Sequence, residues 1–471
     1  MQISSHAGTG NFMITLRPYQ QQLINEIRGQ YQLGHKSVLA VLPTGSGKTV
    51  CFSHIAERSA KRGNRVCVLV HRAELLDQSS RSMPVHHGLI AAGRSMDLSH
   101  SVQIASVQTL ARRLHQLPRD FFQLLIVDEA HHTTAGTWAK VLEYFNTARL
   151  LGVTATPIRC DGRGLGENYE SMVLGPSAKW LTEQGFLADA KVLAPPGIQT
   201  KGLRKRMGDF DMKQAEGLLQ EGQAMGDCLT HYRQHLNGQT AIAFCCSVAH
   251  AEAVAGLFMA NGVAAASIDG KMDAARRRGL LASLGRGEIK VLASCSLIGE
   301  GVDVPSVGGC ILLRPTQSTA LHLQMIGRCL RPSPGKDKAV VLDHVGNTLR
   351  LGHHLEEREW TLDGEQKSKR EKCTSVKVCP KCFAAMSAQA SQCDECGHKF
   401  AAESRRELTT VEGSLQELRV EAAQERIKKK QRKREQGQAQ SLEQLVELGK
   451  SRGYKYPIAW ARKVYAARVR N

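Results

Sequence analysis

The chain has 471 residues, of which 42% are hydrophobic and 5% aromatic, and its formal net charge is +19. The composition is that of an ordinary soluble protein, and the length suffices for about three domains. The excess of Lys and Arg indicates a polyanionic partner, either nucleic acid or an anionic membrane. No apolar run approaches the roughly 20 residues of a membrane-spanning helix, which excludes an integral membrane protein. Residues 1–11 lack the features of a signal peptide, so we expect a cytoplasmic location.

Predicted strands alternate with helical stretches in two series, the pattern of parallel sheets wrapped by helices. The first series comprises residues 37–43, 65–70, 102–105, 123–128 and 149–154, and the second 239–244, 264–268, 289–294, 309–313 and 339–343. Between them, residues 159–225 are rich in Gly and charge and indicate a connector with some helix. We therefore expect an α/β protein with two doubly wound parallel-sheet domains, residues 1–185 and 228–362, joined by a linker over residues 186–227.

The first predicted strand runs into a glycine-rich loop followed by a helix, the context that a phosphate-binding loop requires. The loop reads Pro43-Thr44-Gly45-Ser46-Gly47-Lys48-Thr49. Small residues let backbone N–H groups close around a β-phosphate, while Lys48 reaches the β and γ oxygens and the Thr49 hydroxyl ligates Mg²⁺. Leu42 stands where such loops usually have their first Gly, a departure that leaves the cradle intact.

The second element with a chemical signature is an apolar strand that ends in acids, Leu124-Leu125-Ile126-Val127-Asp128-Glu129-Ala130-His131. Asp128 is placed to hold Mg²⁺ and Glu129 to orient and deprotonate the attacking water, the two tasks that phosphoryl transfer to water leaves for carboxylates. Alone, such an acid pair would be read as a helix cap. The phosphate-binding loop about 80 residues upstream favours the catalytic interpretation.

A third element lies in the second series of strands and reads Gln324-Met325-Ile326-Gly327-Arg328-Cys329-Leu330-Arg331. On a helix, Arg328 and Arg331 share one face, where two guanidinium groups would meet a γ-phosphate held by the other domain. The alternative is a solvated basic face. The presence of the other two elements favours contact with the phosphate.

With further motifs in the same order, these elements resemble the full motif series of superfamily 2 helicases. The motifs that carry the resemblance are Arg17-Pro18-Tyr19-Gln20, Thr44-Gly45-Ser46-Gly47-Lys48-Thr49, Val70-His71-Arg72-Ala73-Glu74-Leu75, Ser106-Val107-Gln108-Thr109, Asp128-Glu129-Ala130-His131, Thr154-Ala155-Thr156-Pro157, Gly299-Glu300-Gly301-Val302-Asp303-Val304-Pro305 and the run from Gln324 to Arg331. Within that superfamily the chain is most similar to RadD-type and phage or prophage DEAH-box proteins, through its early Arg-Pro-Tyr-Gln, the cysteine cluster after the motor and its aromatic and basic close.

The resemblance implies two RecA-like domains with ATP in the cleft between them. The residues expected at the nucleotide and its Mg²⁺ are Arg17, Gln20, Thr44, Gly45, Ser46, Gly47, Lys48, Thr49, Asp128, Glu129, Gly301, Asp303 and Gln324. The residues expected to couple that site to nucleic acid are His131, Thr154 and Thr156. Arg328 and Arg331 would be arginine fingers, and residues 70–72 and 106–108 would contact the sugar-phosphate backbone.

The activity implied is that of an ATP-dependent helicase or translocase. Its expected partner is DNA, single-stranded or branched, and its expected processes are replication, recombination or repair. The alternatives are an RNA helicase, a duplex DNA translocase or motor subunit of a restriction or defence assembly, and a clamp that uses ATP only as a switch. Glu129 argues against the clamp, because a pure switch has no need of a general base.

Two Cys-x-x-Cys knuckles follow the motor, Cys379-Pro380-Lys381-Cys382 and Cys393-Asp394-Glu395-Cys396. Paired knuckles suit a tetrahedral thiolate site, so we expect a structural Zn²⁺ in a ribbon over residues 373–400. Buried structural cysteines and a redox pair are the alternatives. Cys373 and His398 lie close enough in the sequence to substitute for a ligand.

Residues 401–471 are expected to form a basic helical tail. The basic run 428–434 is either a solvated helix face or a nucleic-acid contact, and Leu442, Leu445, Val446 and Leu448 have helical spacing. Aromatic and basic residues over 454–465 either stack on bases or pack a small helical hairpin. The ribbon or the tail is also a candidate surface for a protein partner.

Overall fold

The computed structural model describes residues 15–71, 73–133, 136–159, 162–194, 203–206, 209–221, 224–295, 307–364, 376–400, 435, 439, 441–453 and 457–469. The chain divides into two compact units, Met1–Phe400 and Ala401–Asn471. Among the described residues, no helix combines the length and the apolar character that crossing a bilayer demands.

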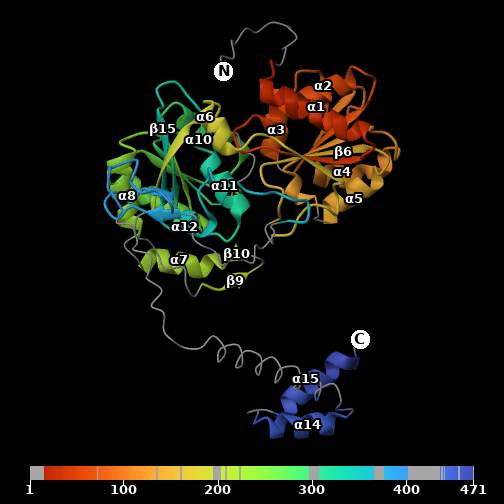
Figure 1. Ribbon diagram of the computed structural model, residues 1–471. Coiled ribbons are helices and arrows are strands. Elements are labelled where there is room, and N and C mark those ends of the chain that lie inside the picture. The colour runs from red at the N-terminus through yellow and green to blue at the C-terminus, as the bar shows by residue number, and fades with distance from the viewer. Residues whose placement is uncertain are drawn as a thin grey trace. The chain divides into compact units, whose positions relative to one another are not determined.

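A parallel sheet of seven strands, ordered β3-β4-β2-β5-β6-β1-β7, forms the core of the first half of the larger unit (Figure 1). Its strands are β1 (Ser37–Val41), β2 (Val66–Val70), β3 (His87–Ile90), β4 (Val102–Ser106), β5 (Leu124–Asp128), β6 (Arg149–Thr154) and β7 (Ser171–Leu174). Its helices are α1 (Pro18–Gln32), α2 (Lys48–Ala60), α3 (Ala73–Ser82), α4 (Val107–Arg113), α5 (Gly136–Tyr144) and α6 (Ala178–Glu183), with short 3₁₀ turns η1 (Leu114–Gln116) and η2 (Ala130–His132).

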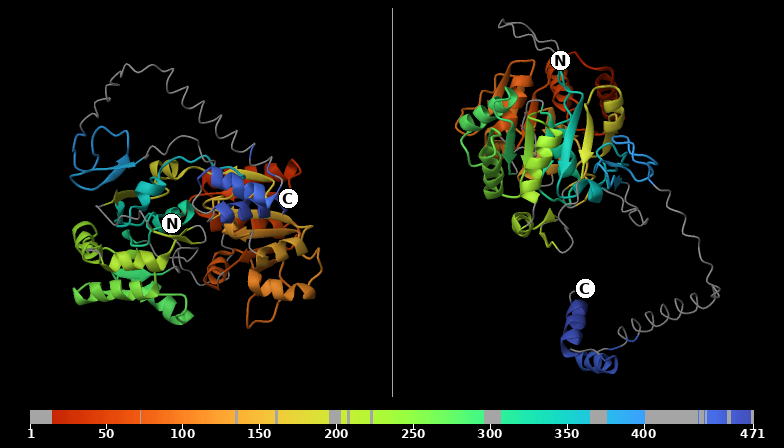
Figure 2. Two further views of the ribbon diagram at one scale, coloured as in Figure 1. Left: turned by 90° about the horizontal axis from the view of Figure 1, so that it is seen from below. Right: turned by 90° about the vertical axis from the view of Figure 1, so that its left-hand side faces the viewer.

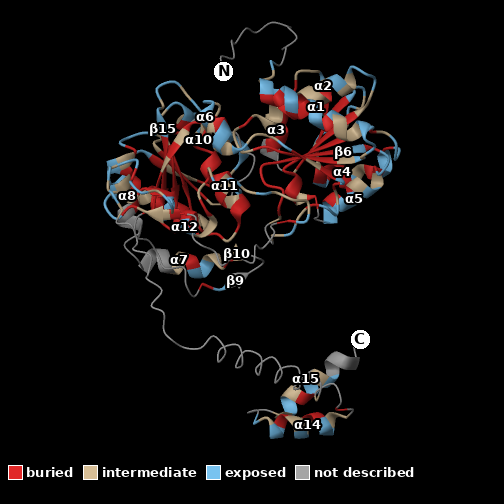
Figure 3. Ribbon diagram, in the orientation of Figure 1, coloured by how far each residue is buried: buried red, intermediate tan, exposed pale blue. Residues whose placement is uncertain are grey.

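Apolar side chains cover both faces of this sheet. On β1, Val38 and Ala40 join a cluster that includes α1 and α2, whereas Leu39 and Val41 join a cluster that includes α4 and α5. Because successive side chains of a strand point to opposite faces, a strand buried on both faces is apolar along its whole length. Figure 3 shows the strands buried and the outer sides of the helices exposed.

A second parallel sheet of six strands is ordered β12-β13-β11-β14-β15-β8. Its strands are β8 (Asp189–Leu193), β11 (Ala241–Phe244), β12 (Ala265–Ile268), β13 (Val291–Ser294), β14 (Gly309–Leu312) and β15 (Lys338–Asp343). The other elements of this half are α7 (Met212–Glu221), α8 (Ala224–His235), α9 (Val248–Ala260), α10 (Ala274–Gly285), α11 (Thr319–Gly327), α12 (Asn347–Leu351) and the two-stranded ribbon of β9 (Lys205–Arg206) and β10 (Asp209–Phe210). The predicted α/β fold with two parallel sheets is confirmed.

Residues 186–227, which the sequence suggests as a linker, contain strand β8. This strand pairs in parallel with β15 at the edge of the second sheet. Val192 and Leu193 are buried there, but Asp189 and Lys191 give the run the mixed polarity of a surface segment. Strands β3 and β7, also unexpected, are edge strands of four residues, too short to show a clear period.

The four-cysteine segment packs on the free side of β8. It contains the antiparallel strands β16 (Val376–Val378) and β17 (Ala385–Ser387). Ala384 forms an antiparallel bridge with Leu193, and the Ala194 N–H donates to the Phe383 carbonyl at 2.9 Å. Lys191 pairs with Glu395 at 2.9 Å. The segment therefore extends the second sheet.

After the second sheet the chain returns to the first sheet's helical layer through residues 360–364, which we call the strap. Gly364 forms an antiparallel bridge with Arg163, and the Gly166 N–H donates to the Leu362 carbonyl at 2.9 Å. Trp360 and Leu362 pack against the cluster on the α4 and α5 side of the first sheet. The strap thus connects the second half of the unit to the first.

The smaller unit contains α14 (Leu442–Ser451) and α15 (Pro457–Val469), which pack as a helical pair (Figure 2). Leu445 and Ala461 are buried between them. The helices approach closely at Gly449, where a Cβ atom would lie 3.0 Å from the Pro457 Cβ.

Gly164→Ala should detach the strap, because a Cβ atom at Gly164 would lie 1.9 Å from the Leu362 carbonyl oxygen and neither backbone can yield cheaply. We expect a loss of about 1–3 kcal/mol in unfolding free energy, the usual cost of overpacking, and faster hydrogen exchange at the Gly166 N–H. Gly29→Ala is the matched control, because a Cβ there meets nothing within 4 Å. Unchanged exchange at Gly166 in Gly164→Ala would contradict the docking of the strap.

Candidate functional site

The glycine-rich loop lies between the end of β1 and the start of α2. Gly45 and Gly47 have φ angles of 86° and 88°, in the left-handed region that only glycine enters without strain. Leu42, where a first Gly is usual, is fully buried in the core. Lys48 is the first residue of α2 and Thr49 the second, so the backbone N–H groups at this helix start are placed to bind an anion.

The N-terminus of α1 packs directly on this loop. The Gln20 Nε2 donates to the Ser46 carbonyl at 3.1 Å, and the Tyr19 hydroxyl donates to the same oxygen at 2.6 Å. The Arg17 guanidinium lies over the Phe186 ring, 4.7 Å from its centroid. Arg17 and Gln20 are therefore beside the loop, as the resemblance implies. Phe186 carries no signal in the sequence, whereas Tyr19 lies inside the motif that contains Gln20.

Asp128 and Glu129 lie at the carboxyl end of β5, beside Lys48. The Glu129 N–H donates to the Asp128 Oδ1 at 3.0 Å, and Glu129 has a φ of 55°, an uncommon conformation for a residue with a side chain. Within the described residues, the buried Glu129 Oε2 accepts no hydrogen bond. The only ion-pair partner of this oxygen in the described chain is His131, whose Nδ1 is 3.5 Å away, so this oxygen has room to bind a water molecule.

Burial and opposing charges act together on the ionisation of these groups. Burial raises the pKa of Asp128 to about 7, the charge of Glu129 raises it too, and Lys48 opposes the rise. Burial lowers the pKa of Lys48, Glu129 and Asp128 oppose this change, and Arg328 and Arg331 add to it. Each cation and carboxylate here is therefore close enough to influence the others.

A chain of polar contacts links Glu129 to the end of β6. His131 Nδ1 lies 3.5 Å from the Glu129 Oε2 and 3.3 Å from the Thr154 Oγ1. The Thr154 hydroxyl donates to the Thr156 carbonyl at 2.9 Å. The structure thus places His131 against Glu129 and links it through Thr154 to Thr156.

The end of α11 meets the phosphate-binding loop from the second sheet. A Cβ atom at Gly327 would lie 2.4 Å from the Thr44 Cβ, and a Cβ atom at Gly45 would lie 4.0 Å from the Arg331 Cγ. The prediction that Arg328 and Arg331 share a helix face is wrong, because α11 ends at Gly327. Arg328 caps the helix and Arg331 follows it, so the turn rather than a helix face directs both residues towards the loop.

The second half is also expected to contribute Gln324, Gly301 and Asp303 to the nucleotide site. Gln324 is buried in α11, and among the described residues its Nε2 has no hydrogen-bond partner. Gly301 and Asp303 lie outside the described residues.

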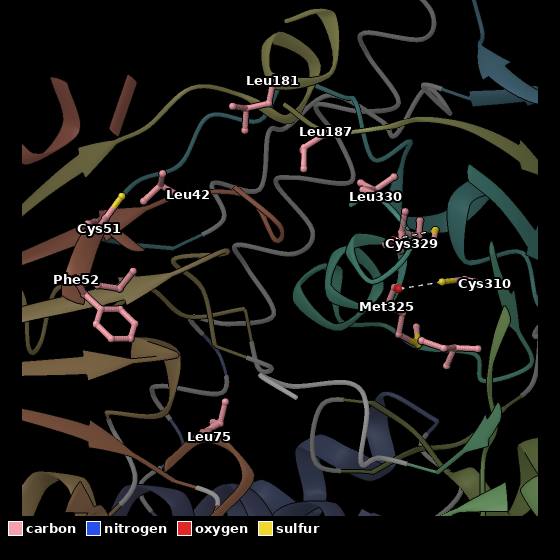
Figure 4. Packing of buried hydrophobic residues seen from close by; sticks show 14 of the residues in the cluster. Leu42, Cys51, Phe52, Leu75, Leu181, Leu187, Cys310, Met325, Cys329 and Leu330 are labelled. Atoms are coloured by element: carbon pink, nitrogen blue, oxygen red, sulfur yellow. Dashed lines mark hydrogen bonds between the residues drawn. The ribbon is translucent and has the colours of Figure 1, made fainter. Parts of the chain in front are cut away.

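Apolar side chains hold the two halves together beside this site. Leu42 comes from the first sheet, Leu330 follows α11, and Leu181 and Leu187 lie between the two sheets in sequence; all belong to one buried cluster (Figure 4). The Ala188 N–H donates to the Leu330 carbonyl at 2.8 Å. Buried apolar packing therefore supports the contact between the glycine-rich loop and the arginines.

The expected nucleic-acid contacts lie after the carboxyl ends of β2 and β4. The Gln108 Nε2 donates to the His71 carbonyl at 3.1 Å, and the Ser106 hydroxyl donates to the Gln108 Oε1 at 2.9 Å. The His71 and His132 ring centroids are 4.6 Å apart, which joins this surface to the turn after Glu129. Arg72 lies outside the described residues. His132 was not expected from the sequence, although it adjoins the acid motif.

The four cysteines of the two knuckles converge. All four Sγ atoms lie within 4.8 Å of one another, with Cys379 to Cys396 at 3.6 Å and Cys382 to Cys393 at 3.5 Å. Tetrahedral Zn–S bonds of about 2.3 Å place sulfur atoms about 3.8 Å apart, so the set fits one Zn²⁺.

The two substitute ligands considered from the sequence do not join this group. His398 is outside the convergent set, and its ring packs against Phe400 with centroids 5.3 Å apart. Cys373 lies outside the described residues. At Cys379, burial raises the thiol pKa, but N–H groups of Cys382 and Lys381 outweigh it and lower the pKa to about 7, which favours the thiolate that a metal needs.

Of the described aromatic residues in the smaller unit, Trp460 packs in the helical pair and Tyr465 is exposed. Trp460 packs on Gly449, and the Arg452 guanidinium lies 6.0 Å from the Trp460 ring centroid. Tyr465 is 39% exposed. The basic run 428–434 and residues 454–456 lie outside the described residues.

Comparisons with known proteins agree with this geometry. Residues 13–159 match the family described as "Type III restriction enzyme, res subunit", and residues 223–333 match "Helicase conserved C-terminal domain". The chain is 33% identical over 388 residues to a 51.5 kDa protein of Lactococcus phage isolate 7-9, covering 82% of this chain and 83% of the phage protein. It is 29% identical over 357 residues to IRC3 of Saccharomyces cerevisiae, named as an ATP-dependent helicase, covering 70% of this chain and 51% of the yeast protein.

Solved structures share the fold. A fragment of the HsdR subunit of a type I restriction enzyme from Vibrio vulnificus YJ016 matches with a TM-score of 0.57 and 24% identity, over 72% of this chain and 65% of that one. The type ISP restriction-modification enzyme LlaBIII, solved bound to DNA, matches with a TM-score of 0.53 and 19% identity, over 70% of this chain and 27% of that one. The motif order, the two parallel sheets and these relatives together show that the chain belongs to the superfamily 2 DExH-box helicases and is a nucleic-acid-dependent ATPase.

Proposed function

We propose that this helicase hydrolyses ATP where the glycine-rich loop meets Arg328 and Arg331, and uses the energy to move along DNA. The observation that carries the proposal is the convergence of Lys48, Asp128 and Glu129 from the first half with Gly327 and the arginines after it from the second. An ATP site built from both halves makes their closure depend on the nucleotide.

Each residue then has one task. The loop N–H groups and Lys48 bind the terminal phosphates, while Arg17 and Gln20 lie where the adenine would be read. Thr49 and Asp128 would hold Mg²⁺, which when bound neutralises charge on the β and γ oxygens. Lys48 and Arg328 oppose the burial that raises the pKa of Asp128, and a bound cation would act in the same direction. Gln324 and Thr44 complete the walls of the proposed nucleotide site.

In the hydrolytic step a water oxygen bonds to the γ-phosphorus while the bond from that phosphorus to the β-γ bridging oxygen breaks. Glu129 orients the water and accepts its proton, giving ADP and phosphate. Arg328 and Arg331 offset the charge that spreads over the γ oxygens. His131 contacts Glu129 and Thr154, and its neighbour His132 packs on His71, so occupancy of the surface around His71 can alter the position of the general base.

DNA is the substrate that the relatives favour. A Sulfurisphaera tokodaii protein named as a DNA 3'-5' translocase is 25% identical over 393 residues, and the restriction enzyme of similar fold was solved with DNA. The second candidate is a duplex translocase that serves as the motor of a restriction enzyme, because the family match and both structural neighbours are named as restriction enzymes or their subunits.

ATPase rates measured side by side with single-stranded DNA, duplex DNA, forked DNA and RNA distinguish these substrates. We expect the largest stimulation by single-stranded or forked DNA. Stimulation by duplex DNA alone would identify the translocase, and stimulation by RNA alone would contradict the DNA proposal.

Glu129→Gln should retain ATP binding but lose hydrolysis by a factor of about 10² or more, because an amide cannot accept the proton of water. Lys48→Ala should weaken binding as well, because it removes a charge from the phosphates. Nucleotide affinity from calorimetry and phosphate release under saturating ATP separate the two effects. Ordinary turnover in Glu129→Gln would refute the role of the general base.

Arg331→Ala should lower kcat by a factor of about 10³ while changing apparent ATP affinity much less, because a finger acts mainly on charge that develops in the transition state. Arg286→Ala is the control, since that exposed residue pairs only with its neighbours Ser283 and Glu288 within the described chain. Equal kcat values in the two variants would contradict a role of Arg331 in hydrolysis.

The four convergent cysteines are proposed to hold one structural Zn²⁺. Purified protein should contain one zinc per chain, and Cys382→Ser or Cys396→Ser should lower that content and increase hydrogen exchange at the Ala194 N–H, which pairs with the ribbon. Cys295→Ser, outside the cluster, should keep the metal. Absence of zinc from freshly purified protein in elemental analysis would contradict the zinc site.

A further inference from the structure

A cavity of about 980 Å³ lies on the first half of the large unit, away from the residues assigned to ATP. Its wall is formed by the C-terminal parts of α1 and α2 and by the loops that lead into β5 and β6. Leu124, which lines it, is the first residue of β5, whereas Asp128 is the last. At about 3.3 Å per residue these ends of the strand are about 13 Å apart.

The rim of this cavity is strongly basic. Arg28, Arg58, Arg62 and Arg149 all line it, and Asp120 is the one acidic residue among the lining residues. Within the described part of the chain, the guanidinium groups of Arg28, Arg58 and Arg62 make no hydrogen bond or ion pair. The three side chains are exposed, and an anion with several oxygens can accept bidentate hydrogen bonds from such guanidinium groups.

The floor of the cavity is apolar and partly aromatic. Ile24, Ile27 and Phe122 are buried beneath it. The Tyr31 hydroxyl donates to the Leu150 carbonyl at 2.8 Å, which fixes the ring, and the Arg149 guanidinium lies 5.3 Å from that ring's centroid. A rigid ring and an apolar floor beside a cationic rim suit a ligand with a flat or apolar body and a charged end.

His54 stands between these two surfaces. Its Nδ1 is buried and has no hydrogen-bond partner among the described residues. Burial lowers the pKa of His54, Glu57 opposes the change, and Arg58, Lys61 and Arg28 lower the pKa further. His54 therefore adds a neutral polar ring to the wall of the cavity.

We propose that this cavity binds a small phosphate ester with a planar or apolar body, the chemistry of a free nucleotide. The phosphate would meet Arg28, Arg58 and Arg62, and the body would lie on the floor beside Tyr31. A travelling nucleic-acid strand is disfavoured, because His71 and Gln108 lie at the opposite, carboxyl end of the same sheet.

The position also gives the ligand a route to the motor. Helix α1 carries Gln20 near one end and Arg28 near the other, and α2 carries Lys48 and Arg58 in the same way. At about 1.5 Å per residue, Lys48 and Arg58 are about 15 Å apart along one rigid helix. Binding at the rim therefore acts on the two helices whose first turns form the ATP site.

Calorimetric titration of the full-length protein with AMP, GMP, CMP, UMP and pyrophosphate tests this site, with Mg-ADP present in excess. The glycine-rich loop grips the β and γ phosphates, so a monophosphate competes poorly there. We expect one of the monophosphates to bind with 1:1 stoichiometry and a Kd below about 1 mM. The matching nucleoside, which lacks the phosphate, should bind at least tenfold more weakly.

Arg28→Gln and Arg58→Gln should each weaken that binding at least tenfold, with unchanged circular dichroism and unchanged basal ATPase activity. Arg278→Gln, an exposed arginine of α10 outside the cavity, is the control for a general loss of positive charge. Absence of binding by every titrant up to several millimolar would overturn the proposal. Equal weakening by all three substitutions, or equal affinity for the nucleoside, would overturn it as well.

Discussion

The close approach of the end of α11 to the glycine-rich loop is the contact on which the site depends. Gly327 and Thr44 leave no room for a side chain between them, since a Cβ atom at Gly327 would lie 2.4 Å from the Thr44 Cβ. Arg328 and Arg331 follow directly. Leu42, Leu187 and Leu330 support the approach with apolar contact, and burial of such surface stabilises an arrangement by about 25 cal/mol per Å². Packing thus places charge where phosphate would be.

The charged groups in this site are costly to bury, and opposite charges placed together offset part of that cost. Asp128 and Glu129 repel one another at the end of β5, and burial by itself favours protonation of Asp128. Lys48 and Arg328 oppose that change, although burial also lowers the pKa of Lys48. A site with such opposing costs gains stability when substrate phosphates and a divalent cation enter, so ligand binding and domain closure are linked.

Much of this fold was predictable because parallel strands are buried on both faces. The run Leu124 to Asp128 is apolar until its last residue and could be assigned at sight. Strand β8 could not, because Asp189 and Lys191 face partners that only the folded sheet brings near. The end of α11 at Gly327 was also missed, since Arg328 and Arg331 have helical spacing and only the approach of the loop shows that the helix stops.

The glycine-rich loop and the pair Asp128 and Glu129 were predictable from motifs, because these residues lie at or just after the ends of strands β1 and β5. Contacts between distant segments were not: nothing near Phe186 in the sequence indicates that Arg17 lies over its ring, and the docking of Ala384 on Leu193 has no local signal. The basic cavity is of the same kind, since its arginines come from α1, from α2 and the turn after it, and from the start of β6.

The steady-state ATPase rate of Gly327→Ala, compared with that of Gly279→Ala, tests most directly whether two halves complete one site. A Cβ at Gly279 meets nothing within 4 Å, so the control should retain full activity. The account predicts that Gly327→Ala folds and binds ATP but loses most of its turnover, because the arginines no longer reach the loop. Wild-type turnover in Gly327→Ala would contradict it.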